Sequence, residues 1–162
     1  MKKYGLRKIS KDGKNRYNDF VWPLEVGAEV VCPDWNPKPN CGGGLHCLED
    51  AQGAWELLEG NYWAVLEYDS ANRINIDDNK VKVSKCKIVF LSENHQGLDK
   101  YFKKYFKKFD NRTAYHWAYN IGDRDIMIDR ITESEWAYDW ARYIGNKDVM
   151  IAHFPQLKGY FK

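Results

Sequence analysis

The chain has 162 residues, a formal net charge of +2, and a high aromatic content of 7 Trp, 11 Tyr and 7 Phe. This length suits one domain with a hydrophobic core, alone or with a small appendage, and the aromatic content excludes a disordered chain. The sequence shows no secretory signal and no apolar run of membrane-spanning length, so we expect a cytoplasmic protein that does not bind membranes. In that compartment the four cysteines fit reduced thiols or metal ligands better than disulfides.

The first half of the chain predicts a small α+β domain over residues 1–95. Runs of β-branched and aromatic residues, separated by turn residues, are typical of a small mixed or antiparallel sheet with one or two helices. In the last run Lys82, Lys85 and Lys87 interleave with apolar residues, which predicts one solvent-exposed face. The predicted elements are strands over Lys3–Ile9 and Tyr62–Tyr68, a shaped loop over residues 33–44, a short helix from Asp50 to Glu59, and a hairpin over Asn72–Leu91.

From residue 96 onward the pattern becomes helical. Ala114–Ile128 recurs 23 residues later as Ala137–Ile151, with nine of fifteen pairs identical. A fixed period in the twenties is the signature of stacked repeats, whose units bury their apolar faces on one another. We therefore predict an all-α array of short helical hairpins, with Trp117 and Trp140 in its core. The predicted units are a basic amphipathic helix over 98–109 and repeats over 110–131 and 132–154, within residues 96–162.

The glycine-rich loop contains enough ligands for a zinc ion. Cys32, Cys41, His46 and Cys47 supply three thiols and one imidazole within sixteen residues. The spacing differs from that of common zinc ribbons and fingers, where cysteines come in close pairs. Adjacent His46 and Cys47 would also point to opposite sides of an extended segment. The alternative is a tight glycine turn with buried, reduced cysteines.

The same loop also permits an enzymatic hypothesis. Its order of elements resembles ADP-ribosyltransferase-like folds, which pair an Arg or His on a strand with a later Glu to hold NAD. The resemblance implies that His46 and Glu67 would be catalytic. It further implies that NAD would be contacted by Arg7, Gly43, Gly44, and Tyr62 or Tyr68.

The basic helix offers a nucleic-acid hypothesis. Its lysines could track a phosphate backbone and its aromatic rings could stack on bases. The rings and the lysines lie on opposite faces, however, as in an ordinary amphipathic helix that packs its rings into a core. The lysines concerned are Lys100, Lys103, Lys104, Lys107 and Lys108.

Three segments carry a family resemblance: Trp22 to Gly27, the run Cys41-Gly42-Gly43-Gly44-Leu45-His46, and Val65–Tyr68. Together they look like an uncharacterised domain of bacteriophage and prophage proteins with a CGxGLH core. Such domains are sometimes joined to short repeats of the WA-IG-RD-IMI type. The resemblance covers residues 3–92, with the repeats adding 110–151. It implies a phage or mobile-element origin and no particular reaction.

The sequence as a whole favours a non-enzymatic binding module. In a phage setting this would be an accessory protein, such as an anti-defence inhibitor, that occupies a host protein or a nucleic acid. The alternatives are an NAD-dependent ADP-ribosyltransferase-like enzyme and a zinc-stabilised interaction domain. The binding hypothesis predicts a stable stoichiometric complex without turnover.

Overall fold

The computed structural model divides into two compact units, Met1–Lys108 and Phe109–Lys162. The structure describes residues 1–16, 18–53, 55, 58–77, 79–94, 98, 110–121, 128 and 130–161. The sequence placed the boundary at residues 95–96, close to a stretch that lies mostly outside the described residues. Within the described part of the chain, every helix is too short or too polar to cross a lipid bilayer.

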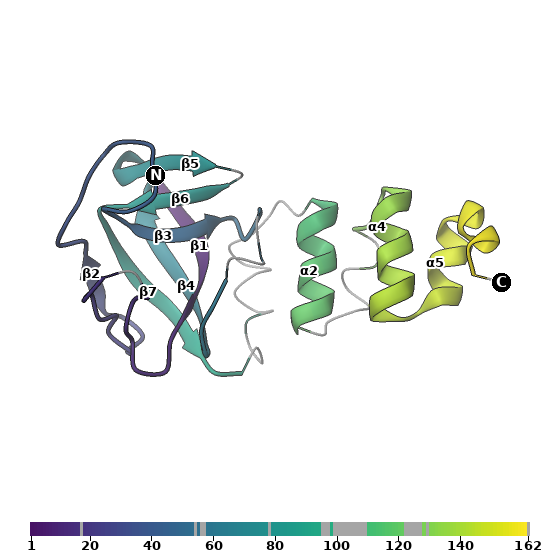
Figure 1. The fold of residues 1–162 in the computed structure, drawn as a ribbon, viewed down its shortest axis with the longest axis horizontal. Coiled ribbons are helices and arrows are strands. Elements are labelled where there is room, and N and C mark those ends of the chain that lie inside the picture. The colour runs from purple at the N-terminus through teal and green to yellow at the C-terminus, as the bar shows by residue number, and fades with distance from the viewer. Residues whose placement is uncertain are drawn as a thin grey trace. The chain divides into compact units, whose positions relative to one another are not determined.

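The first unit is built on a seven-stranded sheet in which every strand pairing is antiparallel (Figure 1). The strand order is β2-β7-β4-β1-β3-β6-β5, so β2 and β5 form the two edges. The strands are β1 (Lys2–Ile9), β2 (Glu29–Val31), β3 (Leu45–Glu49), β4 (Tyr62–Asp69), β5 (Arg73–Asp77), β6 (Lys80–Val83) and β7 (Lys85–Ser92), with a 3-10 turn, η2 (Ser70–Asn72), between β4 and β5.

One face of this sheet forms a continuous hydrophobic core. The cluster includes Val30 of β2 and Val83 of β6, although these strands lie near opposite ends of the strand order. The sheet must therefore curve so that both ends reach the same core, as the twist of antiparallel strands allows. The central strand β4 has buried residues on both faces, from Trp63 to Leu66, which explains its nearly continuous apolar sequence.

The predicted strands at the start of the chain and at residues 62–68 are confirmed as β1 and β4. The predicted hairpin is confirmed at its turn, but its second arm breaks at Ser84 into β6 and β7. The expectation for Lys82 was wrong, because this side chain is fully buried. Asp50 does not cap a helix, since Asp50 and Ala51 adopt the left-handed backbone of a turn, with φ of 53° and 56°.

The second unit corrects the predicted all-α array of helical hairpins. Its described residues form three short α-helices and do not show an array. They are α2 (Asn111–Ile121), α4 (Ser134–Asp139) and α5 (Lys147–His153), with a short π-helix, η3 (Trp140–Ile144), continuing α4 and a short 3-10 helix, η4 (Pro155–Gly159), near the end. Two copies of a short segment are too few for a solenoid, which needs about three units to bury its repeated faces.

The duplication nevertheless sets the packing inside this unit. Trp117 of α2 and Trp140 of η3 are both fully buried, which confirms their predicted core positions. The two residues that precede α4 are bound by a side chain of α2. Asn111 Oδ1 accepts from the N–H groups of Thr132 and Glu133 at 2.6 Å and 3.2 Å. Asn111 thus ties the start of the second copy to the start of the first.

Candidate functional site

The glycine-rich loop is fastened by the buried lysine of β6. Lys82 Nζ donates hydrogen bonds of 2.9 Å to the backbone carbonyls of Asn40 and Gly42. A Cβ added at Gly44 would lie 2.7 Å from Cβ of Lys82, and one added at Gly43 would lie 2.6 Å from Cβ of Asn36. These two glycines therefore make room for contacts within the protein. Their predicted contact with NAD stays a prediction.

His46 follows the loop on β3 and is half-buried. Burial lowers its pKa to about 4, and the positive charges of Lys80, Arg7 and Lys82 add to this effect. Its buried Nε2 atom has no hydrogen-bond partner among the residues that the structure describes. His46 is therefore a neutral imidazole near neutral pH.

The four predicted zinc ligands are dispersed. Cys32 Sγ donates to Asp34 Oδ1 at 3.1 Å, and the exposed Cys41 thiol lies 3.5 Å from Lys80 Nζ. Cys47 belongs to the hydrophobic core, whereas neighbouring His46 points to the opposite face of the strand. Across the described residues, which include all four ligands, no cluster of three or more His, Cys, Asp or Glu side chains is suited to a metal ion.

Arg7 is built into the core side of the sheet. Its Nη1 donates to the carbonyl oxygen of His46 at 2.7 Å, and its guanidinium lies 4.5 Å from the ring centroid of Trp22. Burial lowers the pKa of Arg7 to about 10, still well above neutral pH. Burial also raises the pKa of the Cys86 thiol to about 12 and that of Cys47 further, so both stay protonated and unreactive.

The predicted catalytic pair is not assembled. Glu67 accepts from Lys2 Nζ at 2.8 Å and from the Tyr4 hydroxyl at 3.0 Å, and both hydrogen bonds lower its pKa. Glu67 lies opposite Tyr4 on one side of β1, while His46 belongs to β3 on the other side. The β1–β3 register places His46 opposite Lys8, four residues further along, or about 13 Å at the rise of a strand.

Tyr62, another predicted cofactor contact, is partly buried against the core at the start of β4. A hydrogen bond to Glu93 raises the pKa of its hydroxyl. Tyr62 and Glu67 lie five residues apart on the same strand. Their side chains therefore point to opposite faces of the sheet.

Sequence reasoning missed a buried carboxylate in β3. Glu49 accepts two hydrogen bonds from Arg73, at 2.6 Å and 2.9 Å, and one of 2.9 Å from the Tyr68 hydroxyl. Burial opposes ionisation of Glu49, but these hydrogen bonds and the charges of Arg73 and Lys3 keep its pKa below the ordinary value. The cluster closes one end of the core with paired charges. No local sequence motif predicts this cluster, because its residues come from four different strands.

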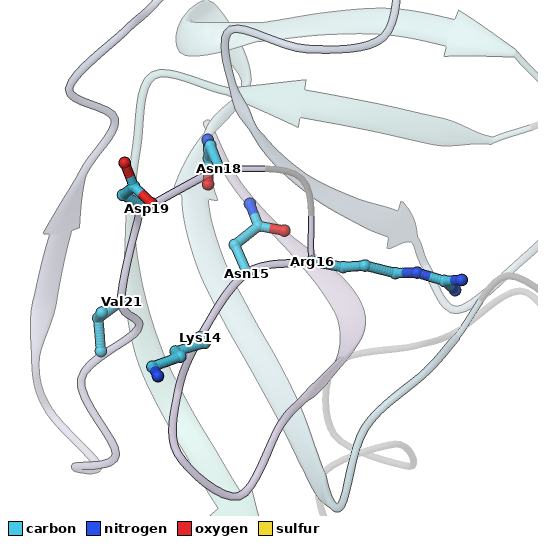
Figure 2. Close-up of a pocket in the computed structure, with 6 residues that line it drawn as sticks. All are labelled: Lys14, Asn15, Arg16, Asn18, Asp19 and Val21. Carbon is cyan, nitrogen blue, oxygen red and sulfur yellow. The ribbon is translucent and has the colours of Figure 1, made fainter.

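A second overlooked feature lies beside β2. The loop that precedes the strand lines a shallow concavity of about 460 Å³, in which the Arg16 side chain is directed away from Asp19 and Val21 (Figure 2). An adjoining concavity of about 480 Å³, here named the Val21 groove, is lined by Asn18, Asp19, Phe20, Val21, Pro33 and Asp34. Since Pro33 and Asp34 follow β2 closely in the chain, the groove starts where this edge strand ends.

The lysines predicted to contact nucleic acid all lie outside the described residues. They are Lys100, Lys103, Lys104, Lys107 and Lys108. Their role stays a prediction.

The first unit is thus an all-antiparallel β domain with a closed glycine loop and an open edge strand. Residues 4–98, more than half of the chain, match a family described as Domain of unknown function (DUF7666). The chain belongs to this family. No curated protein and no solved structure matches the chain.

Proposed function

We propose that the protein is a binding module that holds a protein partner through the segment Val21–Val31. In the phage or mobile-element setting that the CGxGLH resemblance implies, it would be an accessory protein and its partner a host protein. An anti-defence inhibitor would act in this way, by occupying a host component without turnover.

The observation that carries this proposal is the distribution of exposed apolar side chains. Val21, Leu24, Val26 and Val31 are 54%, 40%, 55% and 68% exposed. Apart from Met1, they are all the exposed large apolar residues among the described residues of the first unit. All four belong to the one segment Val21–Val31, and exposed apolar side chains concentrated in one region mark sites of protein interaction more often than scattered ones do.

The charged groups of the glycine loop and its neighbours support the same choice. Lys82, Glu49 and Glu67 are each held by contacts within the protein. The groups predicted for NAD chemistry, His46 and Glu67, lie on strands separated by β1. A binding role needs none of these groups to react.

Affinity capture from a host lysate tests the proposal. The full chain is compared with a double variant, Val26→Asp with Val31→Asp, and with Val149→Asp, which changes an exposed valine of the second unit. We expect a protein in stoichiometric amount with the wild type and Val149→Asp, and its loss with the double variant. Mass spectrometry and nucleic-acid staining identify what co-purifies.

An empty capture would contradict the proposal, as would a protein recovered equally with all three chains. Recovery of nucleic acid alone would favour the basic-helix hypothesis instead. Circular dichroism of the double variant checks that the exposed substitutions leave the fold intact.

A further inference from the structure

We propose that β2 receives an extended segment of the partner as an additional strand, and that this segment is basic and rich in β-branched residues. The inference rests on the proposed protein-binding function and specifies its partner. The carrying observation is that β2, which has a described strand on one side only, is followed directly in the chain by residues of an acidic, apolar groove.

The backbone of β2 has one side available. Ile88 N–H donates to the carbonyl of Ala28 at 3.0 Å, and Cys32 N–H donates to the carbonyl of Ser84 at 2.8 Å. In an antiparallel pair, the backbone N–H and C=O groups of successive residues point alternately toward the partner strand and away from it. Since those of Ala28 and Cys32 point toward β7, the amide groups of Glu29 and Val31 point away from it. No described strand lies on that side, because β2 ends the strand order. Such an edge can pair with an incoming strand.

The side chains around this edge suit an apolar strand. Val30 is buried in the core, whereas Val31 points outward at 68% exposure. An added strand would set its alternate side chains against Val31 on one face of the sheet. On the other face its side chains would reach Phe20 and Val21, which line the Val21 groove. β-branched residues favour the extended backbone that both contacts require.

The charge of the groove indicates the charge of the partner segment. Asp19 and Asp34 line it, no Lys or Arg does, and neither carboxylate forms an ion pair with a described residue. Glu29 of β2 lies directly opposite Lys87 of β7, which offsets its charge, so Asp19 and Asp34 alone set the sign of the groove. A Lys or Arg in the partner would meet these carboxylates.

A display experiment identifies the preferred segment. A random heptapeptide library is selected on the full chain, and the enriched peptides are synthesised with a fluorescent label for anisotropy titrations. We expect enriched sequences to combine Val, Ile or Thr with Lys or Arg. Hydrogen exchange of the amides of Glu29 and Val31 should slow when such a peptide is bound, because strand addition places them in hydrogen bonds.

One substitution separates strand addition from other modes of binding. Val31→Pro removes an outward N–H group without removing a β2–β7 hydrogen bond, so the edge strand should persist. We expect at least tenfold weaker peptide binding by Val31→Pro and less than threefold by Val31→Thr, which keeps the amide. Asp19→Asn should weaken binding a few-fold and reduce its dependence on salt.

Several results would overturn the inference. They are enrichment of acidic peptides, unchanged affinity of Val31→Pro, or unchanged exchange of the Glu29 and Val31 amides on binding. If Val31→Pro fails to fold, the exchange measurement on the wild type decides. A dimer in sedimentation that Val31→Pro dissociates would identify a second copy as the occupant and would also overturn it. Partner capture that survives Val31→Pro would leave the proposed binding function standing while removing strand addition.

Discussion

The glycine loop and the β2 edge lie next to each other in the sequence, but they differ in whether their backbone polar groups have hydrogen-bond partners among the described residues. In the loop, the carbonyls of Asn40 and Gly42 accept hydrogen bonds from a fully buried ammonium, that of Lys82. At the edge, the amide groups of Glu29 and Val31 face away from β7 with no described strand beside them. The loop is therefore completed from within the protein, whereas no described strand pairs with the outer side of the edge.

This difference shows that a distinctive sequence motif and an edge strand are not equally good indicators of a binding site. The glycine loop carries the most distinctive motif of the sequence, and it would ordinarily draw attention as a ligand site. Its glycines instead pack against Asn36 and Lys82. The edge has no motif at all, but no described strand pairs with its outer backbone groups, and its Val31 is exposed. The predictions below test whether the loop is structural and the edge is not.

The largest expected effect belongs to Lys82→Met. This change keeps the buried aliphatic stem but removes the ammonium, leaving two loop carbonyls without their donor. We expect the free energy of unfolding to fall by about 2 to 4 kcal/mol. Urea denaturation monitored by circular dichroism measures this free energy. Lys85→Met, at an exposed position of β7, serves as the control and should change stability by less than about 0.5 kcal/mol. Equal stability of the two variants would show that Lys82 does not hold the loop.

A pair of glycine variants tests the packing of the loop. Gly42 and Gly43 both have positive φ, 89° and 54°, so alanine is strained at either position. A Cβ at Gly43 would also collide with Asn36, whereas a Cβ at Gly42 meets nothing within 4 Å. We expect Gly43→Ala to cost about 2 to 3 kcal/mol and Gly42→Ala about 1 kcal/mol, measured by urea denaturation. Similar losses in the two variants would mean that the loop relaxes around the added methyl group.

The sequence was informative where local pattern decides structure. The strands β1 and β4 could be predicted because both are long runs of residues with β propensity, bounded by turn residues. The turn near Asn79 could be predicted for the same reason. Adjacent His46 and Cys47 could also be assigned to opposite faces, since alternation along a strand is a local property.

The sequence was misleading where burial depends on distant residues. A lysine that interleaves with valines predicts a solvent-facing side chain, but Lys82 is covered by a loop forty residues earlier. The contacts of Glu49 with Tyr68 and Arg73 depend on strand register across the sheet. The repeat predicted buried tryptophans correctly, since Trp117 and Trp140 share a local environment. It overstated the architecture, because the number of stacked units is not a local property.

The next effect in size is a pH dependence that originates in His46. Its pKa is about 4 in the folded protein, below the ordinary value of 6.5. Between these values the unfolded chain binds a proton that the folded chain does not, so stability falls as the pH is lowered from about 6.5 to about 4. Above that window His46 contributes no slope. Because the imidazole is only half-buried, we expect a loss on the order of 1 kcal/mol.

The variant His46→Gln isolates this contribution. The pKa values of Glu49 and Glu67 are also lowered in the folded protein, so protonation of these carboxylates on acidification destabilises the protein as well. The informative quantity is therefore the difference between wild type and variant in the free energy of unfolding, measured across pH 4 to 7. We expect that difference to change with pH in this window and to level off above it. A constant difference would show that His46 titrates alike in the folded and unfolded chains.

The smallest expected effect on stability is at the edge itself. Val30 and Val31 are neighbours on β2, 3% and 68% exposed, so the same substitution tests the core and the edge one residue apart. Val30→Thr places a hydroxyl in the core and should cost about 1 to 2 kcal/mol, whereas Val31→Thr should cost less than about 0.5 kcal/mol in urea denaturation. A large loss for Val31→Thr would mean that this valine serves the fold. If the loss is small, folding gives no reason for a valine there, and binding another chain is the physical reason that the structure offers.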